Sequence, residues 1–423
     1  MPYIPAASSL LAGFPPIKGV RWFNVLVLVT TPAAALYGLC CTTLHSWTAA
    51  FAAAYYVFSM LDISSSGLGY HRLWSHRSYK ASKGLQYFLL LGGTSAAQGS
   101  VCWWARSHRS HHRYTDTDFD PYNSSRGLLW THIGWMVVKT DIHAGKVDVS
   151  DLEKDAITRW QHRHYFSLMV VFGFLLPTLV PALLWDDLTG GFCIAACLRL
   201  TVAHHSTFCI NSIAHYLGEQ PYDDRLSPKD HLLSAILTMG EGYHNFHHQF
   251  PMDYRNAFLW YQYDPTKWFI ALCGWLRLAT NLRVFPSNEI EKGALSMKLK
   301  FLKEVQDALE WPVAPEKLPV VSWETFQEQS RERTLILVSG FIHDVSAFVD
   351  DHPGGPQLLA SKSGQDMTSA FFGGVYAHSN AAHNLLAMMR VGILAGGMEV
   401  LDGRDVSPGE RLHIVDCDTS SSS

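Results

Sequence analysis

The sequence predicts a mostly α-helical membrane protein with four transmembrane helices and a small α+β domain near its carboxyl end. Hydrophobic residues make up 48% of the 423 residues and charged residues only 17%, below the ~25% usual for soluble domains. Four mostly apolar stretches reach the ~20 residues that a bilayer crossing needs. After a proline-rich segment, the composition changes to that of a small soluble domain.

Charge and cysteine content exclude several classes of protein. The net charge is −4 and no basic tract occurs, so nucleic-acid binding has no electrostatic support. The eight cysteines are scattered and form no CxxC pair, which excludes a disulfide scaffold and a thiolate zinc site and suits a reducing cytosolic face. Residues 1–21 lack the pattern of a signal peptide and are expected to be a cytosolic segment.

The four apolar stretches are about residues 22–44, 48–68, 165–184 and 190–210. The short connections at residues 45–47 and 185–189 contain no Lys or Arg, whereas residues 72–163 contain thirteen. The positive-inside rule therefore places both short loops outside and the rest of the chain, with both termini, in the cytosol.

Four polar residues fall within these stretches: Asp62, Arg199, His204 and His205. An ionisable group at membrane depth is a functional candidate. The alternative is that these side chains lie near helix ends or pair inside the bundle.

Beyond the apolar stretches, residues 287–319 contain a charged amphipathic helix at 289–311 and a linker marked by Pro312, Pro315 and Pro319. Residues 320–395 form the small soluble domain, with a strand expected at 334–338. Residues 396–423 are a serine-ended tail that is expected to be disordered.

Nine of the 22 histidines fall in four clusters: His71 and His76; His108, His111 and His112; His215, four residues after Asn211; and His244, His247 and His248. On an α-helix the HxxHH spacing aims three imidazoles at one spot. Nine donors exceed the four of a structural zinc site, so two ions are expected to share them. Imidazole suits zinc, copper, iron and nickel, which leaves the metal open.

Two details of the histidine pattern each allow two interpretations. His71 and His76 are five residues apart, which rotates them by about 140° on an α-helix, so they flank a helix end or serve two different ions. Asp116, Asp118 and Asp120 either orient ligand imidazoles or form a solvated turn.

The segments HRLWSH, HRSHH, NSIAH and EGYHNFHH, in this order, resemble the integral-membrane acyl-CoA Δ9 (stearoyl-CoA) desaturases over residues 22–283. The resemblance implies a membrane desaturase domain at residues 22–286, with a cytosolic helical cap and a kinked tunnel for the acyl chain. It implies a di-iron centre held by the nine histidines, with Asn211 reaching one iron through a water. The implied reaction places a cis double bond in a saturated fatty acyl-CoA, using O₂ and two electrons, in the endoplasmic reticulum membrane.

The same resemblance suggests substrate contacts: Gln98, Arg106 and Lys139 near the head group, and Trp104 and Thr207 at the tunnel kink. The chain departs from the family at Ser107, where animal members have an acidic residue, and at Ser59, Asp62 and Ile63 near the closed end of the tunnel. These departures leave chain length and bond position open.

A second histidine pair lies in the carboxyl-terminal domain. His352 opens an HPGG turn and His378 follows 26 residues later; two such residues can bind haem iron axially and pass electrons. The segments HDVSAFVDDHPGG and AFFGGVYAHSNAA resemble cytochrome b5, and fungal-type desaturases carry this domain fused after the catalytic part. Because no GxGxxG fingerprint follows a strand, we expect a separate NADH-cytochrome b5 reductase as partner.

Two alternatives remain. One is a lipid hydroxylase or a desaturase of different regiospecificity, and the other is a non-catalytic, His-rich metal-handling membrane protein. Transporters place such ligands near the bilayer midplane, whereas most of these histidines fall in cytosolic segments.

Overall fold

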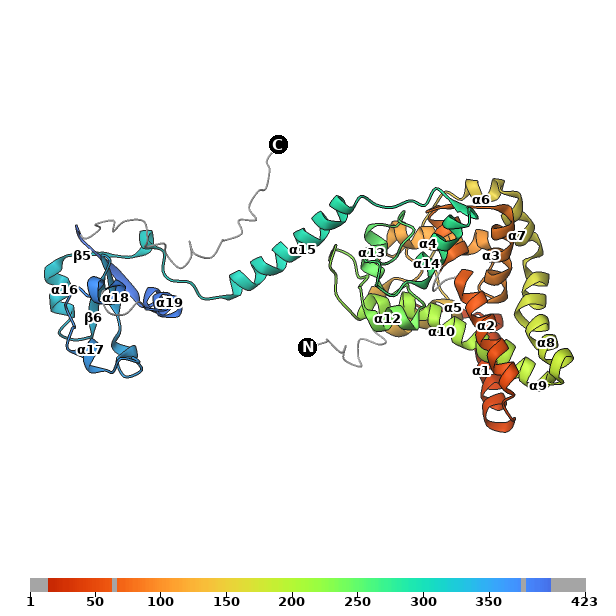
Figure 1. The fold of residues 1–423 in the computed structure, drawn as a ribbon, viewed down its shortest axis with the longest axis horizontal. Coiled ribbons are helices and arrows are strands. Elements are labelled where there is room, and N and C mark those ends of the chain that lie inside the picture. Colours follow the sequence, from red (N-terminus) through yellow and green to blue (C-terminus); the bar gives the residue numbers. More distant parts are fainter. Residues whose placement is uncertain (1–13, 63–66, 374–377, 397–423) are drawn as a thin grey trace. The chain divides into compact units, whose positions relative to one another are not determined.

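The computed structural model describes residues 14–62, 67–373 and 378–396, and the chain divides into two compact units, residues 1–297 and 298–423 (Figure 1). Residues 397–423 of the predicted tail, Ile63 and the side chain of Asp62 lie outside the described part. The two units are described separately.

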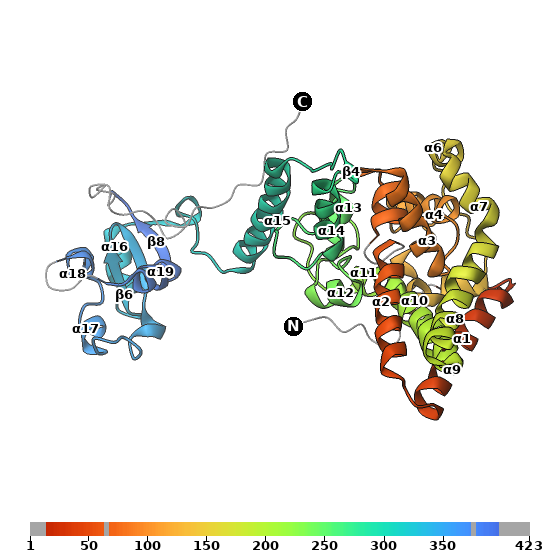
Figure 2. The same cartoon turned by 45° about the vertical axis from the view of Figure 1, so that its right-hand side comes forward.

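Long apolar helices form the extended part of the first unit. They are α1 (Trp22–Cys41), α2 (Ser46–Asp62), α7 (Ala156–Met169), η5 (Val170–Leu175), α8 (Leu176–Trp185), α9 (Leu188–Gly190), η6 (Gly191–Leu198), α10 (Arg199–Asn211) and α11 (Ile213–Tyr216). In both views α1, α2, α8 and α9 extend together away from a layer of shorter helices (Figure 2). The turns of the two hairpins meet at one end, where Trp185 Nε1 donates to Thr48 Oγ1 over 2.8 Å and Thr48 is hydrogen-bonded to Asp187.

Three helices in the described part of the chain are long and apolar enough to cross a membrane: Trp22–Cys41, Ala156–Trp185 and Leu188–Tyr216. The described length of α2 is 17 residues, or about 26 Å at 1.5 Å per residue, so the fourth span stays a prediction. The helix Ala156–Trp185 begins nine residues before the predicted apolar stretch at 165–184, because Asp155 caps it by accepting from Ile157 N (2.7 Å) and Thr158 N (3.0 Å).

Shorter elements build the layer next to these helices. They are η2 (Leu68–Ser75), α3 (Lys83–Ser95), α4 (Val101–Tyr114), η3 (Ser124–Arg126), η4 (Trp130–Gly134), α5 (Trp135–Val137), α6 (Ser150–Lys154), α12 (Leu232–Leu237), α13 (His244–Gln249) and α14 (Pro265–Trp275). Two antiparallel ribbons join distant segments: β1 (Gly19–Val20) with β3 (Val138–Lys139), and β2 (Lys80–Ala81) with β4 (Ala279–Thr280). The largest core cluster packs η2, α3, α4 and α14 together around Leu68, Leu89, Val101 and Ile270.

The helix α15 (Ser287–Ala308) contains the boundary between the two units. It was predicted at 289–311 and ends three residues earlier. A 3₁₀ turn, η7 (Pro315–Lys317), follows in the proline-rich segment.

The second unit is a small α+β domain, as the sequence predicts. Its four-stranded sheet has the order β5 (Val320–Val321), β8 (Arg390–Leu394), β7 (Phe341–Asp344) and β6 (Leu335–Val338), with only the β5–β8 pair parallel. Helices and turns surround it: α16 (Trp323–Gln329), η8 (Ser346–Phe348), α17 (Gln357–Ala360), α18 (Thr368–Phe372) and α19 (Asn380–Met388). Because successive strand residues face opposite sides, β6 places Leu335 and Leu337 in one core and Ile336 and Val338 in another.

Candidate metal centre and haem site

Nine histidines meet in the first unit as two groups, and within each group the ligand-capable nitrogens lie within 4.8 Å of one another. The first group contains His71, His76, His108, His112 and His247, and the second contains His111, His215, His244 and His248. These are the nine histidines singled out from the sequence; His76 directly follows η2, and the others lie in η2, α4, α11 and α13.

The spacing of the nitrogens fits metal ligation. In the first group three pairs of Nε2 atoms are 2.9 Å apart: His71–His247, His76–His108 and His112–His247. In the second group His248 Nε2 lies 3.2 Å from His111 Nε2 and 3.1 Å from His244 Nε2. Two nitrogens about 2.1 Å from one ion and at right angles to each other lie about 3 Å apart, so each group could hold an ion.

Of the two alternatives for His71 and His76, the structure agrees with the helix end, because His76 caps the helix that contains His71, and both histidines belong to one group. The reason is local: η2 is a π-helix, and His76 N donates to His71 O over 3.0 Å. In a π-helix the i to i+5 hydrogen bond stacks residues that are five apart. The two rings therefore lie 4.8 Å apart at the end of the helix.

The HxxHH segments also differ from the expectation that each aims three imidazoles at one spot. In α4, His108 and His112 belong to the first group and His111 belongs to the second. In α13 the assignment is reversed: His244 and His248 belong to the second group and His247 belongs to the first. Residues four apart lie almost in line on a helix, whereas the residue between them is rotated away. Each helix consequently serves both groups.

Several Nδ1 atoms are held by neighbouring polar groups. His111 Nδ1 lies 2.9 and 3.0 Å from the two carboxylate oxygens of Asp120. His215 Nδ1 lies 2.7 Å from Ser227 Oγ, which donates to Asp116 over 2.6 Å. Such partners fix the tautomer that leaves Nε2 for a metal. Asp116 and Asp120 thus take the orienting position predicted for them, while Asp118 pairs with Arg126 at the surface.

Burial favours the neutral form of several of these imidazoles. Removal from water, followed by the effect of neighbouring histidines, lowers the pKa of His108, His112 and His247 well below the usual value. A neutral imidazole has the lone pair that a metal requires.

A buried charge network, which the sequence did not reveal, supports the first group. Arg72 Nη2 lies 2.9 Å from Asp264 Oδ1 and 3.0 Å from Glu241 Oε1, and Glu241 Oε2 lies 3.3 Å from His71 Nδ1. Burial alone would raise the pKa of Glu241, but His71 and Arg72 together hold it below its usual value. The one sign of this network in the sequence is that both residues lie next to metal-site segments: Arg72 follows His71, and Glu241 lies shortly before HNFHH.

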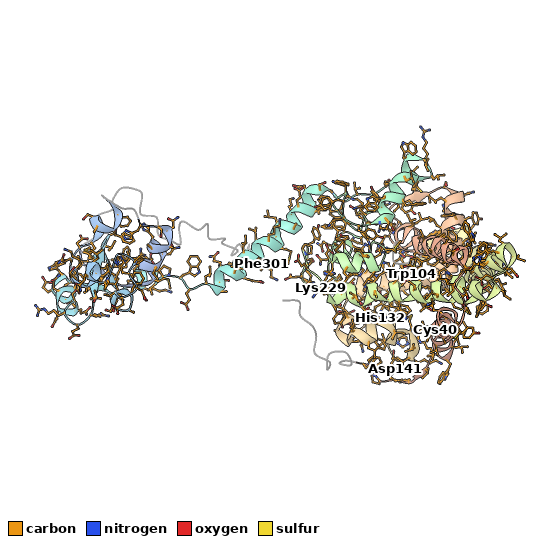
Figure 3. The ribbon with its side chains drawn as sticks, turned by 60° about the horizontal axis from the view of Figure 1, so that its bottom comes forward. Cys40, Trp104, His132, Asp141, Lys229 and Phe301 are labelled. Atoms are coloured by element: carbon orange, nitrogen blue, oxygen red, sulfur yellow. The ribbon has the colours of Figure 1, made fainter. Side chains whose placement is uncertain are left out.

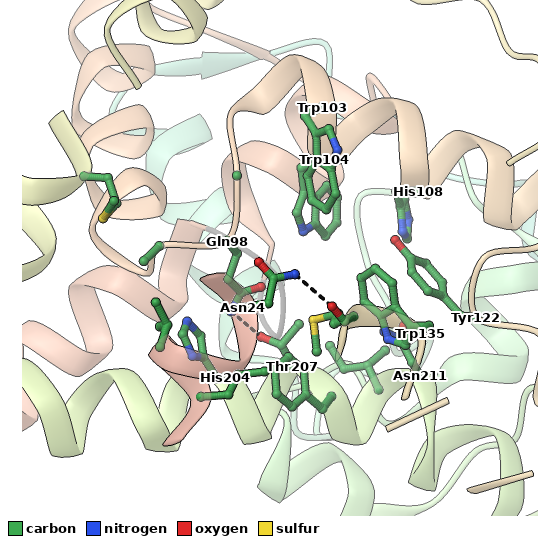
Figure 4. Close-up of a pocket in the computed structure, with 18 of the residues that line it drawn as sticks. Asn24, Gln98, Trp103, Trp104, His108, Tyr122, Trp135, His204, Thr207 and Asn211 are labelled. Atoms are coloured by element: carbon green, nitrogen blue, oxygen red, sulfur yellow. Dashed lines mark hydrogen bonds between the residues drawn. The ribbon is translucent and has the colours of Figure 1, made fainter. Parts of the chain in front are cut away.

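An apolar cavity of about 470 Å³ reaches both histidine groups (Figure 4). Its lining includes His71 and His108 of the first group, His111 and His244 of the second, and side chains from α1, α7 and α10. Asn211 lines it as well.

Of the predicted substrate contacts, Gln98, Trp104 and Thr207 line the cavity, and Gln98 Nε2 donates to Thr207 Oγ1 over 2.9 Å. Arg106 and Lys139 are not among its described lining residues. Arg106 forms an exposed ion pair with Glu153 at 3.0 Å, and Lys139 is exposed on β3.

The polar residues of the apolar stretches divide into two kinds. Arg199 and His204 are buried and bonded inside the bundle. His205 is exposed, and its Nδ1 lies 3.1 Å from Nε2 of His132, which is labelled in Figure 3.

In the second unit, His352 and His378 lie at partly buried positions that suit haem ligands. His352 Nδ1 donates to Gly355 O over 3.2 Å and His378 Nδ1 donates to Phe371 O over 2.9 Å. Because a carbonyl only accepts, each Nδ1 bears the proton and each neutral ring has its lone pair on Nε2. That is the tautomer an axial haem ligand needs.

Comparison with known families agrees with this geometry. The fatty acid desaturase family matches residues 45–272, and the cytochrome b5-like heme/steroid binding domain matches residues 322–395. The chain belongs to the fatty acid desaturase family and has a fused carboxyl-terminal cytochrome b5-like domain.

Curated relatives are similar to this chain over most of their own length. The chain is 48% identical to a probable acyl-CoA desaturase of Schizosaccharomyces pombe, over 90% of this chain and 79% of the relative. It is 43% identical to acyl-CoA desaturase 1 of Saccharomyces cerevisiae, over 89% of this chain and 74% of that one. It is also 43% identical to the Delta(9)-fatty-acid desaturase fat-7 of Caenorhabditis elegans, over 56% of this chain and 71% of the relative.

Proposed function

We propose that this protein is an acyl-CoA desaturase that introduces a cis double bond, at Δ9, into a saturated fatty acyl-CoA. The observation that carries this is the apolar cavity whose wall includes histidines of two buried groups. A saturated hydrocarbon chain offers no polar handle, so an apolar cavity is what binds and orients it.

We assign one iron ion to each histidine group, with Asn211 contributing through a water. When bound, the two ions would supply the O₂ chemistry needed to oxidise an unactivated CH₂–CH₂ unit. The protein's own residues orient the imidazoles, exclude water from the cavity and place the acyl chain beside His71 and His108.

Substrate binding is divided between the cavity and the surface. Gln98, Trp104 and Thr207 contact the acyl chain within the cavity. Arg106 and Lys139, which are exposed, contact the anionic head group of coenzyme A.

The second unit delivers the electrons. Residues 320–395 bind haem b through His352 and His378, and residues 22–286 are the membrane domain. Electrons enter from a separate NADH-cytochrome b5 reductase, and the chain resides in the endoplasmic reticulum membrane with both termini in the cytosol.

The test is expression of the full chain in yeast that lacks its own desaturase, followed by mapping of double bonds in the lipids by mass spectrometry. We expect Δ9 products, two irons per chain, and loss of product in His112→Ala. His143→Ala, at an exposed histidine outside both groups, is the matched control and should keep activity. Hydroxylated lipids would favour the hydroxylase, and bound zinc without O₂ consumption would favour the metal-handling protein.

A further inference from the structure

The reversal between α3 and α4, residues 95–99, forms part of the cavity wall. Ala97, Gln98 and Gly99 line the cavity, and both Ala97 (φ +55°) and Gly99 (φ +98°) have the left-handed backbone that lets the chain turn sharply. The helix that follows presents His108 to the same cavity. The position of this reversal therefore determines the distance between the cavity wall and the histidine groups.

Three contacts with α10 hold the reversal in place. Arg199 Nη1 donates to Ser95 O over 2.9 Å and His204 Nε2 donates to Ala96 O over 2.9 Å. Gln98 then donates to Thr207 of the same helix. Carbonyls at the end of an α-helix lack partners within the helix. By bonding the carbonyls of Ser95 and Ala96, Arg199 and His204 therefore cap the end of α3.

Arg199 is 3% exposed, and no carboxylate lies within ion-pair distance of it in the part of the chain whose side chains are described. Three further bonds run from the guanidinium to Gly173 O (2.7 Å), Ala195 O (3.1 Å) and Ser59 Oγ (3.1 Å), so four of its five N–H groups have described acceptors. A buried charge is costly unless its donors are all used, and the negative end of the α3 dipole offsets part of that cost. The guanidinium thus joins the end of α3 to the helices around it.

The side chain of His204 lines the cavity wall (Figure 4). Since Ala96 O only accepts, Nε2 bears the proton. Nδ1 is buried and has no hydrogen-bond partner among the described residues. The one polar contribution of this side chain is therefore the bond to the reversal.

We propose that Arg199 and His204 are positioning residues that fix the reversal at 95–99 and thereby decide which CH₂–CH₂ unit of the acyl chain is oxidised. The proposal rests on the proposed desaturase function. A shift of the reversal by about 1.5 Å, the length of one carbon–carbon bond, is enough to bring a neighbouring unit to the histidine groups. Neither residue needs to touch the reacting atoms for this effect.

The experiment compares three variants of the full chain in the desaturase-deficient yeast. His204→Leu removes the donor and keeps an apolar side chain of similar size, whereas His204→Gln retains a donor at the end of its side chain. His205→Leu changes the adjacent, exposed histidine and serves as the control. Double-bond position, product chain length and iron per chain are measured for each.

We expect His204→Leu to raise the share of products with a displaced double bond or altered chain length at least fivefold, at unchanged iron content. His204→Gln and His205→Leu should stay within twofold of the parent chain. A His204→Leu protein that makes less product with unchanged bond position and chain length would overturn the proposal, because a merely structural role lowers yield alone. If that variant does not accumulate, His204→Met, which also lacks a donor, decides in the same way. Absence of unsaturated product from the parent chain would instead refute the proposed function.

Discussion

At the scale of single residues, the metal centre depends on which nitrogen of each imidazole bears the proton. His111 and His215 are oriented through Nδ1 by Asp120 and by the Ser227–Asp116 pair. Asp116, Asp120 and Ser227 lie in loops outside the two HxxHH segments. The loops therefore orient these two imidazoles, and a loop residue can be substituted while every histidine is kept.

The substitution Asp120→Asn tests this orientation. An amide in place of the carboxylate weakens the bond to His111 Nδ1 and makes the ligand less basic, so we expect the second group to bind its ion 10- to 100-fold more weakly. Iron retained during titration with a chelator measures the effect. Asp118→Asn, two residues earlier and with a side chain 86% exposed, is the matched control. Equal iron affinity in Asp120→Asn and the parent chain would show that the contact has no orienting role.

At the scale of elements, the π-helix η2 explains how two histidines five residues apart belong to one histidine group. The histidine spacing predicted the nine residues that meet, because His is rare enough for clusters to stand out. It did not predict their division into groups of five and four, because that argument aimed all three imidazoles of each HxxHH segment at one spot, whereas His111 and His247 belong to the other group from their helix neighbours. Arg72, Glu241 and Ser227 were missed for another reason: each acts through partners distant in sequence, and no local pattern marks such contacts.

Gly67, at the start of η2, allows a direct test of the π-helix. Its φ is +53°, and a Cβ added there would lie 2.4 Å from His71 Cβ and 2.7 Å from His71 Nδ1. We expect Gly67→Ala to displace His71, reduce iron in the first group and lower turnover at least tenfold. Gly84→Ala, where an added Cβ meets nothing within 4 Å, should behave like the parent chain. The measurements are the iron content and turnover of the two variants. Equal values would show that Gly67 is not needed to position His71.

The strand β7 carries a buried histidine that makes the second unit sensitive to acid. His343 is 2% exposed, and burial, followed by nearby Arg390, lowers its pKa to about 3. The unfolded chain binds a proton near pH 6.5 while the folded domain does not, so stability is lost as the pH falls from about 6.5 towards 3. The slope reaches about 1.4 kcal/mol per pH unit.

We expect His343→Leu to lessen this loss by about 2 kcal/mol between pH 6.5 and 5.0. Urea unfolding of the full chain, followed by the haem absorbance at both pH values, measures it. All other residues are the same in the two proteins, so their contributions cancel in the comparison. Equal pH dependence in the two proteins would contradict the assignment.

At the scale of the whole molecule, each unit has its own hydrophobic core and its own histidine site. The clusters around η2, α3 and α4 lie within residues 1–297, and those around β6 lie within residues 298–423. Damage to the haem site should therefore leave the metal centre folded and loaded. Fusion then has a kinetic purpose, because a tethered donor replaces diffusional encounter with a high effective concentration.

The double substitution His352→Ala/His378→Ala separates the two sites. We expect the variant to keep about two irons per chain but to lose NADH-driven turnover at least 100-fold, since no bound haem remains to pass electrons. Added free cytochrome b5 should restore turnover at concentrations that approach the effective concentration of the tethered domain, commonly millimolar for short flexible linkers. Product formation with NADH, reductase and increasing free cytochrome b5 is the measurement. Full turnover without added cytochrome b5 would mean that electrons reach the metal centre by a route that bypasses residues 320–395, and the fused domain would then need a different explanation.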